Sequence, residues 1–276
     1  MSLGTIELFA TASMLGLFGL VFVLARRLDN YSIVDVAWSY AFGLLTIFYA
    51  VAGRGWPPRR LAIAIMVSLW SVRLGTHLAV RVRDHHPRED GRYVTMRQEW
   101  GDHLLSRMFR FFQTQALSVI VLAVPFLLIG GNTTTHLTIV EIVGVLVWGI
   151  GWAGESVADA QLARFKGDRA NAGRVCDVGL WRWSRHPNYF FEWTIWMGYW
   201  LIACAVWPWG LATIVSPAII LYLLLRVTGV PLSEAQSLRS RGDAYRRYQQ
   251  VTSVFLPLPQ RRPPTPQSAH GEGSAG

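Results

Sequence analysis

Apolar residues recur along the chain in seven runs, each about 20 residues long and separated by shorter polar stretches. The runs cover residues 5–25, 33–53, 61–82, 113–130, 138–160, 188–206 and 210–229. Each approaches the roughly 20 residues that a helix needs to cross a bilayer core. The runs do not alternate as β-strands do, and lipid-embedded backbone is satisfied only in helices or closed barrels. The pattern predicts an all-α integral membrane protein with seven transmembrane helices.

Basic residues set the expected orientation of these helices. Arginines gather in the connections 26–27, 81–110 and 164–185 and again from residue 226 onward, whereas the opposite side carries only Arg54, Arg59 and Arg60. The positive-inside rule then places the N-terminus outside and the C-terminus in the cytoplasm. We expect the first run to be a retained helix because no basic stretch precedes it and no Ala-x-Ala site follows.

Composition supports a membrane protein and narrows its partners. Of 276 residues, 52% are apolar and only 16% are charged, which excludes a disordered or collagen-like chain. The formal net charge of +9 is explained by topology, so we expect membrane lipids and no nucleic acid as partners. Two cysteines in a loop and a span predict no disulfide. The histidines lack the spacing of a di-iron site, so no metal is expected.

The remaining organisation is simple. We expect one domain over residues 1–256, followed by a Pro-, Gly- and Ser-rich, disordered tail over residues 257–276. Residues 95–112 place Trp100, Met108 and Phe112 near one helical face with arginines between them. This pattern predicts one interfacial helix on the cytoplasmic leaflet.

Six ionisable residues fall at membrane depth, where an uncompensated charge is costly and therefore suggests function. They are Asp35, Arg73, His77, Glu155, Asp159 and Glu192. The predicted topology assigns all of them to the cytoplasmic halves of their helices, which favours one polar chamber open to the cytoplasm. The alternative is a set of buried ion pairs, such as Arg73 with Asp35, that hold the bundle together. Glu141 is interpreted as an ordinary interfacial charge.

Residues 149–154 match G-x-G-x-x-G, but they lie inside an apolar run rather than between a strand and a helix. Small residues that pack helices explain this match better than a dinucleotide site. The stretch 160–192 is more specific: a loop rich in Arg, Gly and aromatic residues leads into a helix at His186-Pro187-Asn188. Helix N-termini and arginines bind anionic groups, so the stretch predicts a phosphorylated or anionic cofactor. Lipid headgroups would satisfy the same arginines.

The residues of this stretch are similar to a motif of a known protein family. The run from Asp159 through Lys166, Arg174 and Ser184-Arg185-His186-Pro187-Asn188-Tyr189 to Glu192 resembles the C-terminal signature of the steroid 5-alpha-reductase family, and more closely its uncharacterised bacterial branch. Shorter matches include Asp35-Val-Ala-Trp38, Trp70-Ser-Val-Arg73, Glu89-Asp90-Gly91-Arg92-Tyr93 and Gly229-Val-Pro231 with Glu234. Together the matches span about residues 35–257.

The resemblance implies a seven-helix membrane reductase that binds NADPH from the cytosolic side. It implies cofactor contacts at the matching positions, which are Asp159, Lys166, Arg174, Asn188, Glu192 and Trp196. Arg185 and His186, in the same motif, are added as cofactor-binding candidates. Lys166 stands where the steroid enzymes have an Arg, and Trp70 falls near the family's catalytic Tyr position. The substrate therefore need not be a steroid enone.

We expect NADPH-dependent reduction of a carbon–carbon double bond, conjugated to a carbonyl, in a lipophilic steroid- or isoprenoid-like substrate. The catalytic candidates are Asp35, Arg73 and Tyr189, which would position the carbonyl and relay a proton. The expected location is a bacterial inner membrane, with the site facing the cytoplasm. One alternative is an S-adenosylmethionine-dependent methyltransferase resembling the isoprenylcysteine carboxyl methyltransferases, which share an Arg-His-Pro-x-Tyr loop. Another is a non-enzymatic lipid-binding membrane protein.

Overall fold

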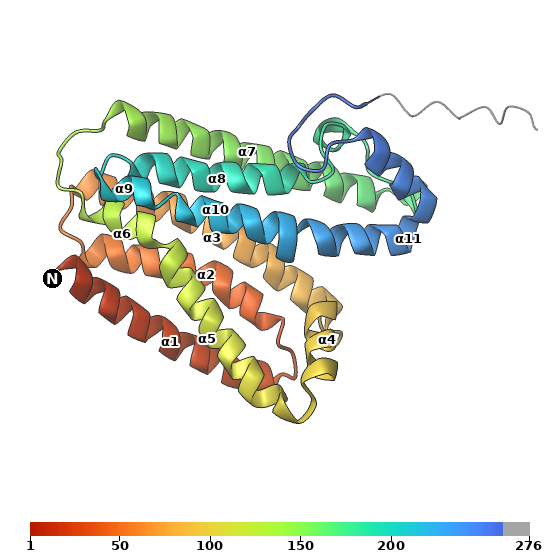
Figure 1. Cartoon of the computed structure of the whole chain (residues 1–276), viewed down its shortest axis with the longest axis horizontal. Coiled ribbons are helices and arrows are strands. Elements are labelled where there is room, and N and C mark those ends of the chain that lie inside the picture. The colour runs from red at the N-terminus through yellow and green to blue at the C-terminus, as the bar shows by residue number, and fades with distance from the viewer. Residues whose placement is uncertain (262–276) are drawn as a thin grey trace, which may run out of the picture. The chain divides into compact units, whose positions relative to one another are not determined.

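The structure is a computed structural model that describes residues 1–261, and over that range it is all-helical, without β-strands (Figure 1). Its long helices are α1 (Leu3–Arg27), α2 (Ile33–Ala52), α3 (Pro57–His85), α5 (Leu104–Leu122), α7 (Ile139–Gly167), α8 (Pro187–Ala203) and α11 (Val230–Val251). Shorter helices are α4 (Gly91–Trp100), α6 (Val124–Gly131), α9 (Trp209–Ala212) and α10 (Val215–Tyr222). The all-helical prediction is confirmed for the described residues.

Six helical stretches of the described chain are long and apolar enough to cross a membrane. They are α1, α2, α3, α7 and the two continuous stretches Gly91–Gly131 and Trp209–Val251. The predicted sixth span coincides with α8, which has 17 residues and lies at the short end of the length that can cross. The chain is thus a multi-pass integral membrane protein. The predicted tail mostly lies outside the described residues, which end at Arg261.

The stretch 95–112 does not form a single helix. Gly101 adopts φ +43°, a backbone conformation that side chains disfavour, and this residue ends α4. After a short 3-10 turn, α5 begins at Leu104 and continues to Leu122, well before the predicted start of the span at residue 113. Half of the expected interfacial segment therefore belongs to the long helix that leads into the membrane.

The described chain forms two compact units. The first comprises residues 1–149 and 195–220, and the second comprises residues 150–194 and the chain from residue 221. In the first unit α1 packs beside α2 and α5, and α2 packs beside α3 (Figure 1). Small residues allow the last contact, because a Cβ on Gly75 would meet the Tyr40 ring at 2.8 Å.

Aromatic side chains fill the core of the first unit. Phe42 of α2 lies 5.4 Å from Trp70 and 5.5 Å from Trp196, ring centroid to ring centroid, with edge-on geometry. Phe126 and Tyr199 extend the cluster, at 4.8 Å from each other. Trp70 and Trp196 are both fully buried. Edge-to-face packing of this kind adds stability beyond the buried area.

A buried ion pair fastens the loop before α7 to α3. Arg59 Nε lies 2.5 Å from Glu141 Oε1, and the two side chains are only 2% and 1% exposed. Arg59 also donates to the carbonyl oxygens of residues 132, 134 and 136, and Thr138 donates to Glu141 through its N–H (2.7 Å) and hydroxyl (2.9 Å). The interpretation of Glu141 as an ordinary interfacial charge is therefore wrong: its carboxylate is enclosed and fully bonded.

In the second unit, α7 runs to Gly167, past the predicted end of its span, so the connection to α8 is residues 168–186. We call this connection the motif loop. It contains two 3-10 turns, η2 (Arg169–Asn171) and η3 (Gly179–Arg182). Gly154 of the G-x-G-x-x-G match packs on α8, since a Cβ there would lie 2.4 Å from the Phe191 ring. Helix packing thus accounts for Gly154.

Candidate functional site

The motif loop is held by the chain segment that follows α11. The Arg185 N–H donates to the Ser253 carbonyl (2.8 Å), and the Leu258 N–H donates to the Trp183 carbonyl (3.0 Å). The Ser184 hydroxyl donates to the Phe255 carbonyl at 2.8 Å. These bonds align the two segments side by side and fix the backbone just before α8. The conformation of the predicted cofactor motif therefore depends on residues about 70 positions later in the chain.

Arg185 is the most heavily bonded side chain of the motif. Its Nε donates to Glu234 Oε1 at 2.6 Å, and its Nη1 donates to the carbonyl oxygens of Gln249 (3.0 Å) and Thr252 (2.7 Å). These contacts connect the motif loop to both ends of α11. The fork of the guanidinium is thus used within the protein, where it satisfies carbonyls at the end of a helix.

His186 shares the same carboxylate. Its Nε2 lies 3.3 Å from Glu234 Oε1, and its ring stacks on Tyr189 with centroids 5.2 Å apart and planes 6° from parallel. Burial is the main cause that lowers the pKa of His186, and the nearby Arg185 charge lowers it further. Glu234 raises the pKa of His186, but the net pKa stays below the usual value. Gln249 completes the group by donating to Glu234 Oε2 at 2.9 Å.

The first turn of α8 contains a buried polar atom that is not satisfied. Asn188 Oδ1 is buried and accepts no hydrogen bond from the described residues 1–261. Pro187 precedes it at the first position of α8, where the backbone N–H groups point out of the helix. A donor from a bound molecule would satisfy this oxygen, so the start of α8 is a candidate ligand site.

The aromatic and basic side chains in and next to the motif loop differ in burial. Trp181 is buried, and its indole N–H donates to the Ala158 carbonyl at 2.9 Å. Gly179, at φ +57°, lets the chain turn against Gln161 of α7, which accepts from the Leu180 N–H at 2.8 Å. Lys166 and Arg174 are exposed, and Arg174 Nη1 donates to Asn171 Oδ1 at 3.4 Å.

The structure assigns the predicted cofactor residues mainly to one unit. Seven of them, Asp159, Lys166, Arg174, Arg185, His186, Asn188 and Glu192, lie in the second unit. Trp196 belongs to the first unit, where it is buried in the aromatic core. Among the catalytic candidates, Asp35 and Arg73 lie in the first unit and Tyr189 lies in the second.

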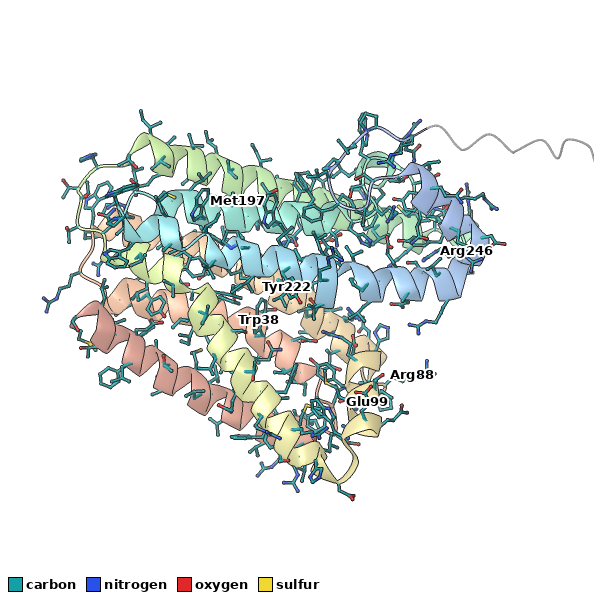
Figure 2. All side chains as sticks on the ribbon, viewed as in Figure 1. Trp38, Arg88, Glu99, Met197, Tyr222 and Arg246 are labelled. Atoms are coloured by element: carbon teal, nitrogen blue, oxygen red, sulfur yellow. The ribbon has the colours of Figure 1, made fainter. Side chains whose placement is uncertain are left out.

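Asp35 has two partners that the sequence did not suggest. The Tyr93 hydroxyl donates to Asp35 Oδ1 at 2.9 Å, and Arg92 Nη2 donates to Oδ2 at 2.7 Å. Asp90 orients Arg92 through its Oδ1, which accepts from the Arg92 Nε at 3.1 Å. Arg88, just before α4, and Glu99, within α4, are exposed (Figure 2). Arg92 and Tyr93 belong to the Glu89–Tyr93 stretch that resembles the family, but the resemblance alone does not pair them with Asp35.

The long apolar helices define the class of multi-pass helical membrane proteins. The family profile described as "Protein of unknown function (DUF1295)" matches residues 21–252. The chain therefore belongs to this family, a family of membrane proteins related to steroid 5-alpha-reductase.

A protein of fission yeast is similar to part of this chain. The chain is 30% identical to "Uncharacterized protein C594.04c" of Schizosaccharomyces pombe. The similarity covers 62% of this chain and 57% of the yeast protein, so the chain spans little more than half of that relative. No solved structure matches the chain.

Proposed function

We propose that this chain is a membrane reductase that uses NADPH to reduce a carbon–carbon double bond, conjugated to a carbonyl, in a lipophilic substrate. Membership of a family related to steroid 5-alpha-reductase supports the reaction class. The observation that carries the proposal is the buried, unsatisfied Asn188 Oδ1 at the start of α8. Such an oxygen costs about 1–3 kcal/mol until it finds a donor, and the carboxamide N–H of a nicotinamide is a suitable one.

The basic residues of the same unit fit the rest of a dinucleotide. Lys166 and Arg174 are exposed cations at the end of α7 and in the motif loop, and Arg can bind a phosphate with two parallel hydrogen bonds. Arg185 and His186 already bind Glu234. We therefore assign them the positioning of α8, and we assign cofactor contact to Asp159, Lys166, Arg174, Asn188 and Glu192.

NADPH supplies a hydride when bound. The second hydrogen added to the double bond is a proton, which must come from the protein or from water. The Tyr93 hydroxyl, 2.9 Å from Asp35 Oδ1, forms a phenol–carboxyl pair able to hold and pass on a proton. Arg73 and Tyr189 are the further candidates for orienting the substrate carbonyl. The proposal includes seven spans, a cytoplasmic C-terminus and a site on the cytoplasmic face of a bacterial inner membrane.

Titration of the purified chain in detergent tests the cofactor. We expect NADPH to bind more tightly than NADH or S-adenosylmethionine, and we expect Arg174→Ala and Asn188→Leu to weaken NADPH binding. Arg246→Ala is the matched control, because Arg246 is exposed on α11 and pairs with Asp243 at 3.2 Å (Figure 2). Tighter binding of S-adenosylmethionine would favour a methyltransferase, and binding of none of the three would favour a lipid-binding protein; either result overturns the proposal.

A further inference from the structure

The segment after α11 returns to the start of α8. Residues 253–258, which we call the C-terminal strip, bond to residues 183–185 of the motif loop. Phe255 anchors the strip, with its ring centroid 5.7 Å from that of Phe190 and 6.0 Å from that of Trp193. Both partners lie in the first two turns of α8, within about 10 Å of its start along the helix axis. The strip therefore lies at the level where α8 begins.

The outer side of this strip is apolar. Phe255 is buried at 7% exposure, whereas its neighbours on either side face outward. Val254, Leu256 and Leu258 are 38%, 51% and 48% exposed. Trp183, hydrogen-bonded to Leu258 through the backbone, is 46% exposed. These four exposed apolar side chains, which we call the apolar face, lie on two segments that are hydrogen-bonded to each other, and such exposure is costly in water.

Basic residues flank the segments of the apolar face in the sequence. Arg182 directly precedes Trp183, and Arg261 follows the strip; both are exposed. The Arg261 N–H donates to the Val251 carbonyl at 2.8 Å, which fixes its backbone near the end of α11. A partner that buries the four apolar side chains and meets two arginines must be apolar inside and anionic at its surface. A leaflet that contains anionic phospholipids has this chemistry.

The length of α8 supports the same partner. Its 17 residues span about 26 Å, less than the roughly 30 Å of a hydrocarbon core. A short span is matched by lipid that adjusts around its ends and by flanking residues at the interface. We propose that Trp183, Val254, Leu256 and Leu258 insert into the boundary between headgroups and acyl chains at the start of α8. Arg182 and Arg261 bind the phosphates of anionic lipids there. Tryptophan is enriched at this depth of a bilayer.

Site-specific quenching tests the insertion. Cys176 and Cys204 are first replaced by Ala, and a single cysteine is introduced by Leu256→Cys for labelling with an environment-sensitive fluorophore. The full chain is reconstituted into phosphatidylcholine vesicles, with or without phosphatidylglycerol, that contain a nitroxide-labelled lipid. Asp243→Cys is the matched control, since Asp243 is 79% exposed on α11 of the same unit. We expect several-fold stronger quenching at position 256 than at position 243, and Val254→Cys should reproduce it.

The arginines give a second measurement. With phosphatidylglycerol present, quenching at position 256 should increase, and the double change Arg182→Gln with Arg261→Gln should abolish the increase while Arg246→Gln does not. Equal quenching at positions 256 and 243 would overturn the proposal. So would protection of position 256 from both the nitroxide lipid and aqueous iodide, because another protein would then cover the face. Neither result depends on whether the chain binds NADPH.

Discussion

Arg185 Nε lies 2.6 Å from Glu234 Oε1, and this ion pair joins residues 49 positions apart in the sequence. Both side chains are largely buried, and the same carboxylate also faces His186 and Gln249. One carboxylate thus connects the motif loop, the start of α8 and both ends of α11. Its removal should affect the second unit as a whole rather than one contact.

Glu234→Gln should destabilise the second unit by about 1–3 kcal/mol, because the Arg185 guanidinium would keep its burial but lose its charged partner. The measurement is thermal unfolding of the detergent-solubilised chain followed by tryptophan fluorescence. Asp243→Asn breaks an exposed pair on the same helix and should cost no more than about 0.5 kcal/mol. Equal shifts for the two variants would contradict the assigned role of Glu234.

His186 should make stability depend on pH. Burial lowers its pKa in the folded state, so below about pH 6.5 the unfolded chain binds a proton that the folded chain resists. Stability should therefore be complete above pH 6.5 and should fall as the pH drops below that value. His186→Gln removes the titrating group, so the difference in melting temperature between wild type and variant should change within this window. A pH-independent difference would show that the protonation of His186 is not linked to folding.

The Arg59–Glu141 pair allows a test of buried charge. Arg59→Met leaves the Glu141 carboxylate enclosed without its partner and should cost about 3–5 kcal/mol. Adding Glu141→Leu removes the uncompensated charge and should restore much of the stability. Arg54→Met is the control: Arg54 lies in the connection just before α3 and is exposed, so its loss should have little effect. If the double variant were less stable than Arg59→Met alone, the carboxylate would be stabilising by itself.

Tyr93→Phe separates proton transfer from cofactor binding, given the proposed reaction. Loss of the hydroxyl that contacts Asp35 should lower turnover by about 100-fold to 10,000-fold while leaving NADPH affinity unchanged. The assay is NADPH oxidation with a lipophilic enone, alongside direct titration of NADPH. Tyr31→Phe is the control, because Tyr31 is also buried and packs against Arg97 near the start of α2. Equal losses of turnover in both variants would indicate a general effect of packing.

The spans could be predicted because they are local properties of the sequence. Each apolar run is long enough to imply a helix, and α1, α2 and α3 begin and end within a few residues of the predicted bounds. The predicted helix boundaries were wrong where a single residue decides the conformation. At Gly101, a positive φ ends α4 and separates it from the helix that follows. Nothing in the apolar pattern indicates which glycine adopts that conformation.

The partners of the charged residues could not be predicted, because they are distant in the sequence. Asp35 bonds to Arg92 and Tyr93, which lie 57 and 58 positions away. Arg59 and Glu141 are 82 positions apart, and the apolar pattern alone places them in a loop and at a membrane interface. Residue type predicted that such charges need compensation, but only tertiary structure determines which side chain provides it.

The C-terminal strip also has a consequence for biosynthesis. During translation, Arg185 emerges long before Glu234 and Phe255, so the motif loop cannot reach its final conformation until α11 and the strip have been made. The helices can enter the bilayer earlier, as soon as each apolar run is complete. A ribosome that stopped before residue 253 would release a chain already inserted in the membrane whose motif loop still lacks the bonds that hold it.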